Sequence, residues 1–103
     1  MDTQAIIRET VTSNPVVLYM KGSPKFPQCG FSSLAAQILN ACGAEFVAID
    51  VLQDMDIREG IKQYANWPTI PQLYVKGEFI GGADIMRAMY DSGELQALLQ
   101  SAK

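Results

Sequence analysis

The residue with the clearest chemical potential is Cys29, in the stretch YMKGSPKFPQCGFSSLAAQIL at positions 19–39. It stands between a loop with two prolines and a segment with the periodicity of a helix. The unpaired N–H groups and the positive dipole end of a helix's first turn stabilise a thiolate, so a cysteine there should have a lowered pKa. We therefore interpret Cys29 as an activated thiol rather than a buried structural cysteine, and expect the charge of Lys21 to assist it.

The partners that such a thiol usually has are missing from the sequence. A redox motif with two thiols would carry its second cysteine at position 32, which is Ser32 here. The other cysteine, Cys42, lies on the apolar stripe of the same predicted helix, which favours a small core residue over a redox role. The chain has no histidine, which excludes Cys–His and Ser–His–Asp catalysis and any zinc site that needs histidine. A metal cluster would have to take ligands from a second chain or a small molecule, since two cysteines cannot form a Cys₄ site.

Length and composition predict a single globular domain over residues 1–103. The chain is 49% hydrophobic and 18% charged, with a net charge of −3 and no basic run, so nucleic-acid binding has no electrostatic basis. No apolar run approaches the ~20 residues of a membrane helix, and the first ten residues lack the basic and apolar regions of a secretory signal. Two cysteines do not make a disulfide scaffold, so we expect a reducing compartment and no secretion.

The hydrophobic pattern predicts the elements that position Cys29. Strands are predicted over 14–20, 45–51, 71–75 and 78–82, and helices over 3–13, 30–42, 54–66, 83–93 and 93–102. The helix after Cys29 has an apolar stripe and ends at Gly43; the stripe consists of Phe31, Leu34, Ala35, Ile38, Leu39 and Cys42. Asp54 or Asp56 starts the third helix, and Lys76-Gly77 is typical of a hairpin turn.

This order of elements predicts an α/β fold. The first two strands and the helix between them form a βαβ unit, which is parallel and right-handed. The last two strands form an antiparallel hairpin. A central four-stranded mixed sheet with helices on both faces follows.

Three stretches resemble the monothiol glutaredoxins of the CGFS class. They are Cys29-Gly30-Phe31-Ser32 with Lys21 before it, Trp67-Pro68-Thr69-Ile70-Pro71, and Gly81-Gly82-Ala83-Asp84. The resemblance covers essentially the whole chain, in order and without large gaps. It implies the thioredoxin/glutaredoxin fold and binding of glutathione.

The resemblance also assigns glutathione-binding roles. Lys21 and Arg58 would hold the glycine-end carboxylate, with help from Lys62 or Gln63. The alternative for Lys21 and Arg58 is a pair of solvated surface charges. Pro71 matches the cis proline of thioredoxin-like folds, although a plain turn before a strand is the alternative.

A cis Pro71 would leave the backbone of Ile70 open to pair with the cysteine of glutathione as an added strand, and the resemblance also includes Thr69 among the glutathione-binding residues. The N–H groups of Ala83 and Asp84 suit the carboxylate of the γ-glutamyl end. The Asp84 side chain suits its ammonium, or serves as a helix N-cap. Many family members have a cysteine where this chain has Ala83, which argues against intramolecular dithiol chemistry.

Two functions remain open after the resemblance. The first is an iron–sulfur carrier, in which two subunits share one [2Fe–2S] cluster held by Cys29 of each and by two glutathiones. Its implied states are an apo monomer and a cluster-bound dimer, and its implied partners are BolA-type, scaffold and recipient proteins. The second is a glutathione-dependent thiol-disulfide oxidoreductase with Cys29 as nucleophile. A binding module with an incidental thiol is a third. The compartment implied is the cytoplasm in a bacterium, or the mitochondrial matrix in a eukaryote.

Overall fold

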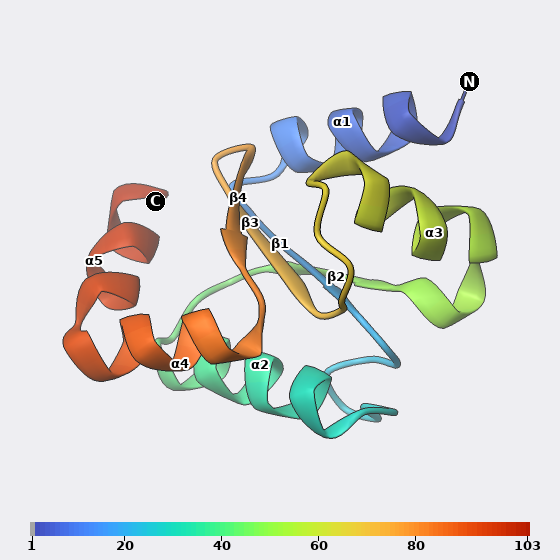
Figure 1. Cartoon of the computed structure of the whole chain (residues 1–103). Helices are drawn as coiled ribbons and strands as arrows, with labels where there is room; N and C mark the ends of the chain where they lie inside the picture. Colours follow the sequence, from blue (N-terminus) through green and yellow to red (C-terminus); the bar gives the residue numbers. More distant parts are fainter. Residues whose placement is uncertain (1) are drawn as a thin grey trace.

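A four-stranded mixed sheet lies at the centre of the computed structural model, which describes residues 2–103 (Figure 1). The strand order is β2-β1-β3-β4, with β1 parallel to β2 and antiparallel to β3, and β3 antiparallel to β4. The predicted βαβ unit, hairpin and mixed sheet are therefore confirmed. The strands are β1 (Val16–Met20), β2 (Val47–Asp50), β3 (Gln72–Val75) and β4 (Glu78–Gly81).

Helices cover both faces of the sheet, with α1 and α3 on one side and α2, α4 and α5 on the other (Figure 1). Within residues 2–103, none of these helices has the length and apolar character needed to cross a membrane. Their bounds are α1 (Thr3–Ser13), α2 (Gly30–Ala41), α3 (Met55–Tyr64), α4 (Ala83–Ser92) and α5 (Glu94–Ser101).

The central strand β1 divides the core into two apolar clusters. Val17 and Tyr19 pack with α1 and α3, whereas Val16, Leu18 and Met20 pack with α2, α4 and α5. Every residue of β1 is buried, which explains its continuous apolar sequence, because a strand covered on both faces has no polar side. The end of β1 is thereby fixed, and the loop to Cys29 starts from there.

Several predicted boundaries and one predicted orientation differ from the structure. Strand β2 is shorter because Val51 belongs to a short 3₁₀ helix, η1 (Val51–Gln53). Asp54, not Asp56, caps α3, and its carboxylate accepts the N–H groups of Asp56 and Ile57. The inward orientation expected for Phe31 is wrong: this side chain is 61% exposed, and it lines a surface hollow instead of the core.

The loop between β1 and α2 is a compact turn. Gly22 and Pro27 form a bridge, and the Gln28 N–H donates to the Lys21 carbonyl at 2.9 Å. Gly22 has φ +88°, and a Cβ at this position would lie 2.5 Å from the Phe26 carbonyl oxygen. Glycine is therefore required here by both conformation and space.

Gly22→Ala should lower the free energy of unfolding by more than the roughly 1–2 kcal/mol that a left-handed conformation alone costs, because the new methyl group also meets backbone atoms. Gly43→Ala is the matched control, since Gly43 has φ +68° and a Cβ added there would meet no atom within 4 Å. Urea unfolding measures both. Equal losses for the two variants would show that the loop is not closely packed.

Candidate functional site

Cys29 is the N-cap of α2, with extended backbone dihedrals of φ −152° and ψ 137°. The thiol is free and half-buried. The side chain makes no capping hydrogen bond, which is expected of a neutral thiol, because its sulfur is a weak acceptor. The free N–H groups of the first turn therefore remain available to a thiolate.

The surroundings of Cys29 hold the pKa of its thiol below the ordinary value. The backbone N–H of Ser32 contributes most, partial burial opposes it, and the Phe31 N–H, the Ser32 hydroxyl and the charge of Lys21 add to it. The predicted activation at a helix N-terminus is confirmed. Of the contributions that lower the pKa of Cys29, the charge of Lys21 is the smallest, so the first turn of α2 is the main activator.

A surface hollow of about 240 Å³ opens between the start of α2 and the start of α4. It brings together four of the predicted site residues, namely Thr69, Ile70, Ala83 and Asp84. Phe31, two residues after Cys29, forms part of the wall. Cys29 is not itself a lining residue, but it lies only two positions before Phe31, which forms one wall of this hollow beside the WPTIP and GGAD stretches.

The Ile70-Pro71 peptide bond is cis, as predicted. Within residues 2–103, the backbone N–H and C=O of Ile70 form no hydrogen bond with another backbone group. Ile70 as a whole residue is only 6% exposed, and it borders the hollow. An extended ligand could therefore pair with this backbone as a short added strand.

Helix α4 begins at the same hollow. Its N-cap is Gly82, which has no side chain to bond the first N–H groups, so the suggestion that Asp84 is the N-cap is wrong. Ala83 is buried and Asp84 is exposed in the first turn. A free helix N-terminus of this kind suits a carboxylate.

The basic residues of the predicted site lie outside the hollow. Lys21 is half-buried at the end of β1, and the Arg58 Nε on α3 is buried without a hydrogen-bond partner among the described residues. Buried donors are normally paired, but this nitrogen has almost no surface that a ligand could reach, so the role of Arg58 in ligand binding stays a prediction. Lys62 instead forms an ion pair with Glu59 at 3.7 Å, and Gln63 lines a different hollow between α1 and α3.

Trp67 also lines the hollow, although the sequence assigns it no role of its own beyond its place in the WPTIP stretch. Its ring packs against Phe79 with centroids 5.4 Å apart, and it lines the hollow beside Gly82. The signal was present in the sequence, because the tryptophan immediately precedes Pro68-Thr69-Ile70-Pro71. Nothing in the sequence alone showed that it borders the start of α4.

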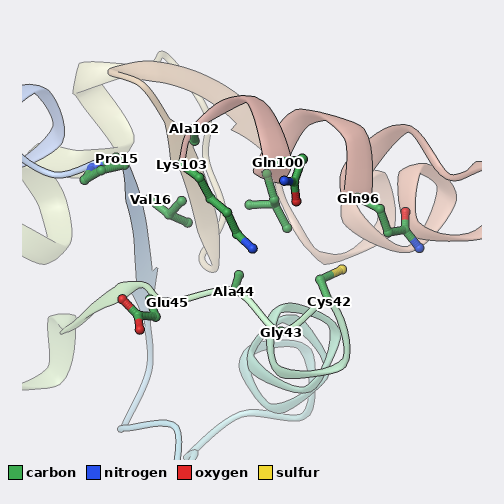
Figure 2. Close-up of a pocket in the computed structure, with 11 residues that line it drawn as sticks. Pro15, Val16, Cys42, Gly43, Ala44, Glu45, Gln96, Gln100, Ala102 and Lys103 are labelled. Atoms are coloured by element: carbon green, nitrogen blue, oxygen red, sulfur yellow. The ribbon is translucent and has the colours of Figure 1, made fainter.

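Cys42 lies at the other end of α2, about 20 Å from Cys29 for a rise of 1.5 Å per residue. It borders a separate hollow of about 470 Å³ beneath α5, whose Gln96 and Gln100 are seen in Figure 2. Burial raises the pKa of the Cys42 thiol, and the residue packs against the core cluster on this face. The interpretation of Cys42 as a small packing residue agrees with this position.

Comparisons with known proteins give the family. The family model described as Glutaredoxin matches residues 16–80. The chain is also 55% identical over 101 residues to the monothiol glutaredoxin ycf64-like of Synechocystis sp., covering 98% of this chain and 94% of that protein. The chain belongs to the monothiol glutaredoxins. This glutaredoxin is similarly 55% identical over 94 residues to Glutaredoxin 4 of Escherichia coli, covering 91% of this chain and 82% of the relative.

Solved structures agree with this assignment. The solution structure of reduced poplar apo GrxS14 superimposes with a TM-score of 0.83 and 47% identity, covering 96% of this chain and 91% of that chain. A buckwheat glutaredoxin–glutathione complex superimposes with a TM-score of 0.86 and 25% identity, covering 97% of this chain and 89% of that chain. The predicted glutaredoxin fold is confirmed.

The two thiols should titrate separately. Cys29, measured in a Cys42→Ala protein, should be alkylated by iodoacetamide with a midpoint below the ordinary value of about 8.5, and Cys42, in a Cys29→Ser protein, with a midpoint above it. A lower pKa leaves more thiolate at neutral pH, so Cys29 should react faster at pH 7. Coinciding midpoints would contradict the assigned role of the first turn of α2.

Proposed function

We propose that this glutaredoxin binds glutathione beside Cys29 and carries a [2Fe–2S] cluster that two chains share. The observation that carries the proposal is the setting of Cys29: one activated, partly exposed thiol close to a hollow that the backbone of Ile70 and the uncapped start of α4 border. The second cysteine is remote from it and has a raised pKa.

Each of the three residues of glutathione has a match at the site. Its γ-glutamyl carboxylate meets the free N–H groups at the start of α4, and its ammonium meets the carboxylate of Asp84. Its cysteine pairs with the free backbone of Ile70, which directs the thiol toward Cys29. Its glycine carboxylate is held by Lys21 and by Arg58, whose buried Nε is without a partner among the described residues. The buckwheat relative is a glutathione complex by name, which supports the same ligand here.

The ligand count supports a shared cluster as cargo. Within residues 2–103 no three His, Cys, Asp or Glu side chains are grouped so that they could hold a metal ion. A [2Fe–2S] cluster bound through sulfur needs four thiolates, and two chains supply two Cys29 thiolates while two bound glutathiones supply the others. Since half of these ligands are small molecules that dissociate, the cluster should be released readily, which suits transfer.

This arrangement defines the states and partners that we propose. The apo protein is a monomer and the loaded protein is a homodimer, because one chain cannot complete the coordination. Partners are BolA-type proteins, scaffold proteins that donate clusters and apo-proteins that receive them, with no role for nucleic acid or membranes. A reducing compartment, the cytoplasm of a bacterium or the mitochondrial matrix of a eukaryote, keeps Cys29 and glutathione reduced.

The lowered pKa of Cys29 favours a second candidate, removal of glutathione from protein mixed disulfides. The Cys29 thiolate attacks the glutathione sulfur, the Cys29–glutathione disulfide forms and the protein leaves as a thiolate. A second glutathione thiolate then attacks the bound glutathione sulfur, forming glutathione disulfide and restoring Cys29. Turnover of a glutathionylated peptide by apo protein, but none by Cys29→Ser, would support this activity.

Cluster assembly should require both Cys29 and glutathione. Anaerobic reconstitution of the wild type with iron, sulfide and glutathione should give visible charge-transfer bands, and omission of glutathione should abolish them. Cys29→Ser should give none, whereas Cys42→Ala should keep them and lose about 1 kcal/mol or more of stability from lost packing. Bands in Cys29→Ser but not in Cys42→Ala would reverse the assignment of the two thiols.

Glutathione affinity should depend on Lys21 and Arg58. Lys21→Ala and Arg58→Ala should each lose roughly 1.5–3 kcal/mol of binding free energy in calorimetry, because each removes a hydrogen bond to a charged group. Lys21→Arg keeps the charge with another geometry and should lie between. Lys25→Ala and Arg87→Ala are matched controls, since Lys25 is exposed and Arg87 forms an ion pair with the exposed Asp91 on the surface of α4. Equal affinities in all four alanine variants would return Lys21 and Arg58 to the role of surface charges.

A further inference from the structure

Two consecutive backbone N–H groups at the end of β1 are each held by a side chain from a distant element. The Lys21 N–H donates to the Ser32 Oγ at 3.0 Å, and the Gly22 N–H donates to the Asp50 Oδ1 at 2.9 Å. These bonds span 11 and 28 positions of the chain. They tie the segment that carries Lys21 to the first turn of α2 and to the end of β2.

Ser32 occupies the position where a second redox thiol would stand. Its side chain is fully buried, and a buried hydroxyl destabilises a protein unless it is hydrogen-bonded. Its oxygen accepts the Lys21 N–H, which a cysteine sulfur would do poorly, because sulfur is a weak acceptor. The serine therefore holds the strand end in a way that a second thiol would not.

Asp50 links the same strand end to the segment that leads to Arg58. Its Oδ1 also accepts the Leu52 N–H at 2.9 Å, and its Oδ2 accepts from the Gln53 side chain at 3.4 Å. One carboxylate oxygen is thus shared between the loop after β1 and the start of η1. Helix α3 follows η1 directly, and Arg58 lies in its first turns.

The hydrogen bonds to Ser32 and Asp50 differ from ordinary loop contacts in where they act. They fall on Lys21 and on the residue next to it, and the Lys21 carbonyl is also fixed by the Gln28 N–H at 2.9 Å. The N–H and the C=O of Lys21 are therefore both hydrogen-bonded, while its ammonium forms no hydrogen bond or ion pair with any residue between 2 and 103. Binding to a carboxylate gains from such preorganisation, because less freedom is lost when the ligand arrives.

We propose that Ser32 and Asp50 are positioning residues for glutathione, forming a backbone clamp at Lys21-Gly22. The clamp fixes the position of Lys21 relative to the start of α2 and to the segment that carries Arg58. The Lys21 ammonium and the Arg58 guanidinium then bind the same glycine carboxylate of glutathione. This inference rests on the proposed binding of glutathione and goes beyond it, since it assigns a role in binding to two residues that need not touch the ligand.

The test combines amide hydrogen exchange with calorimetry of reduced glutathione. Asp50→Ala should accelerate exchange at the Gly22 amide, and Ser32→Ala at the Lys21 amide, and each should weaken glutathione binding about tenfold, the effect of one net hydrogen bond. Asp50→Asn keeps an acceptor oxygen and should retain most of the affinity. Ser33→Ala is the matched control, since the Ser33 hydroxyl accepts a hydrogen bond from the Gln37 side chain on the surface of α2, away from Lys21 and Gly22.

If Ser32 and Asp50 act on glutathione binding through Lys21, the loss of affinity that their replacement causes should depend on the presence of Lys21. In a Lys21→Ala background, Asp50→Ala should cause little further loss of glutathione affinity, because the side chain that it positions is gone. If Asp50→Ala does not fold, Asp50→Asn and Ser32→Ala carry the same comparison with and without Lys21.

The outcomes separate the two proposals. A wild-type protein that binds no glutathione would overturn the proposed function. A wild type that binds, with unchanged affinity in Asp50→Ala and Ser32→Ala despite faster amide exchange, would overturn only the clamp. An equal loss in the presence and absence of Lys21 would also overturn it, because the effect would then be a general one on the fold.

Discussion

The unpaired N–H groups in the first turn of α2 are the feature on which the chemistry of this glutaredoxin depends. They lower the pKa of Cys29 more than any nearby charge does, and they do so only because Cys29 is the N-cap of that helix. The helix is in turn held by the packing of Ala35, Ile38 and Leu39 against β1. The reactivity of one sulfur therefore rests on the burial of a strand that contains no functional side chain.

A second helix with an uncapped start faces the same hollow. Gly82 leaves the first N–H groups of α4 free, and the cis peptide bond before Pro71 is followed by β3, which lies between β1 and β4. One hollow thus joins the first turn of α2, the start of α4 and the backbone of Ile70. Three backbone features, rather than three special side chains, make up most of the proposed ligand site. This construction tolerates Ala83, since an alanine keeps the N–H that the ligand would use.

Local chemistry made the activated thiol predictable from the sequence: periodicity predicted the helix after Cys29, and the position of Cys29 at the start of that helix predicted the lowered pKa. The residues of the hollow were assigned by the family resemblance. Other features depend on contacts between distant segments, which no local pattern encodes. The exposure of Phe31, the bond from Gly22 to Asp50, and the position of Trp67 beside Gly82 belong to this class. Lys62 was assigned by its place one turn after Arg58 on the same helix, and its partly exposed ion pair with Glu59 at 3.7 Å leaves that assignment a prediction.

We propose that one cysteine thiol per chain is sufficient to bind a cluster, because two chains and two glutathione thiols combine around it. Native mass spectrometry of the reconstituted protein measures this composition directly. We predict one species with two chains, two glutathiones and one [2Fe–2S] unit, alongside apo monomer. A loaded monomer, or a loaded dimer that contains no glutathione, would contradict this claim.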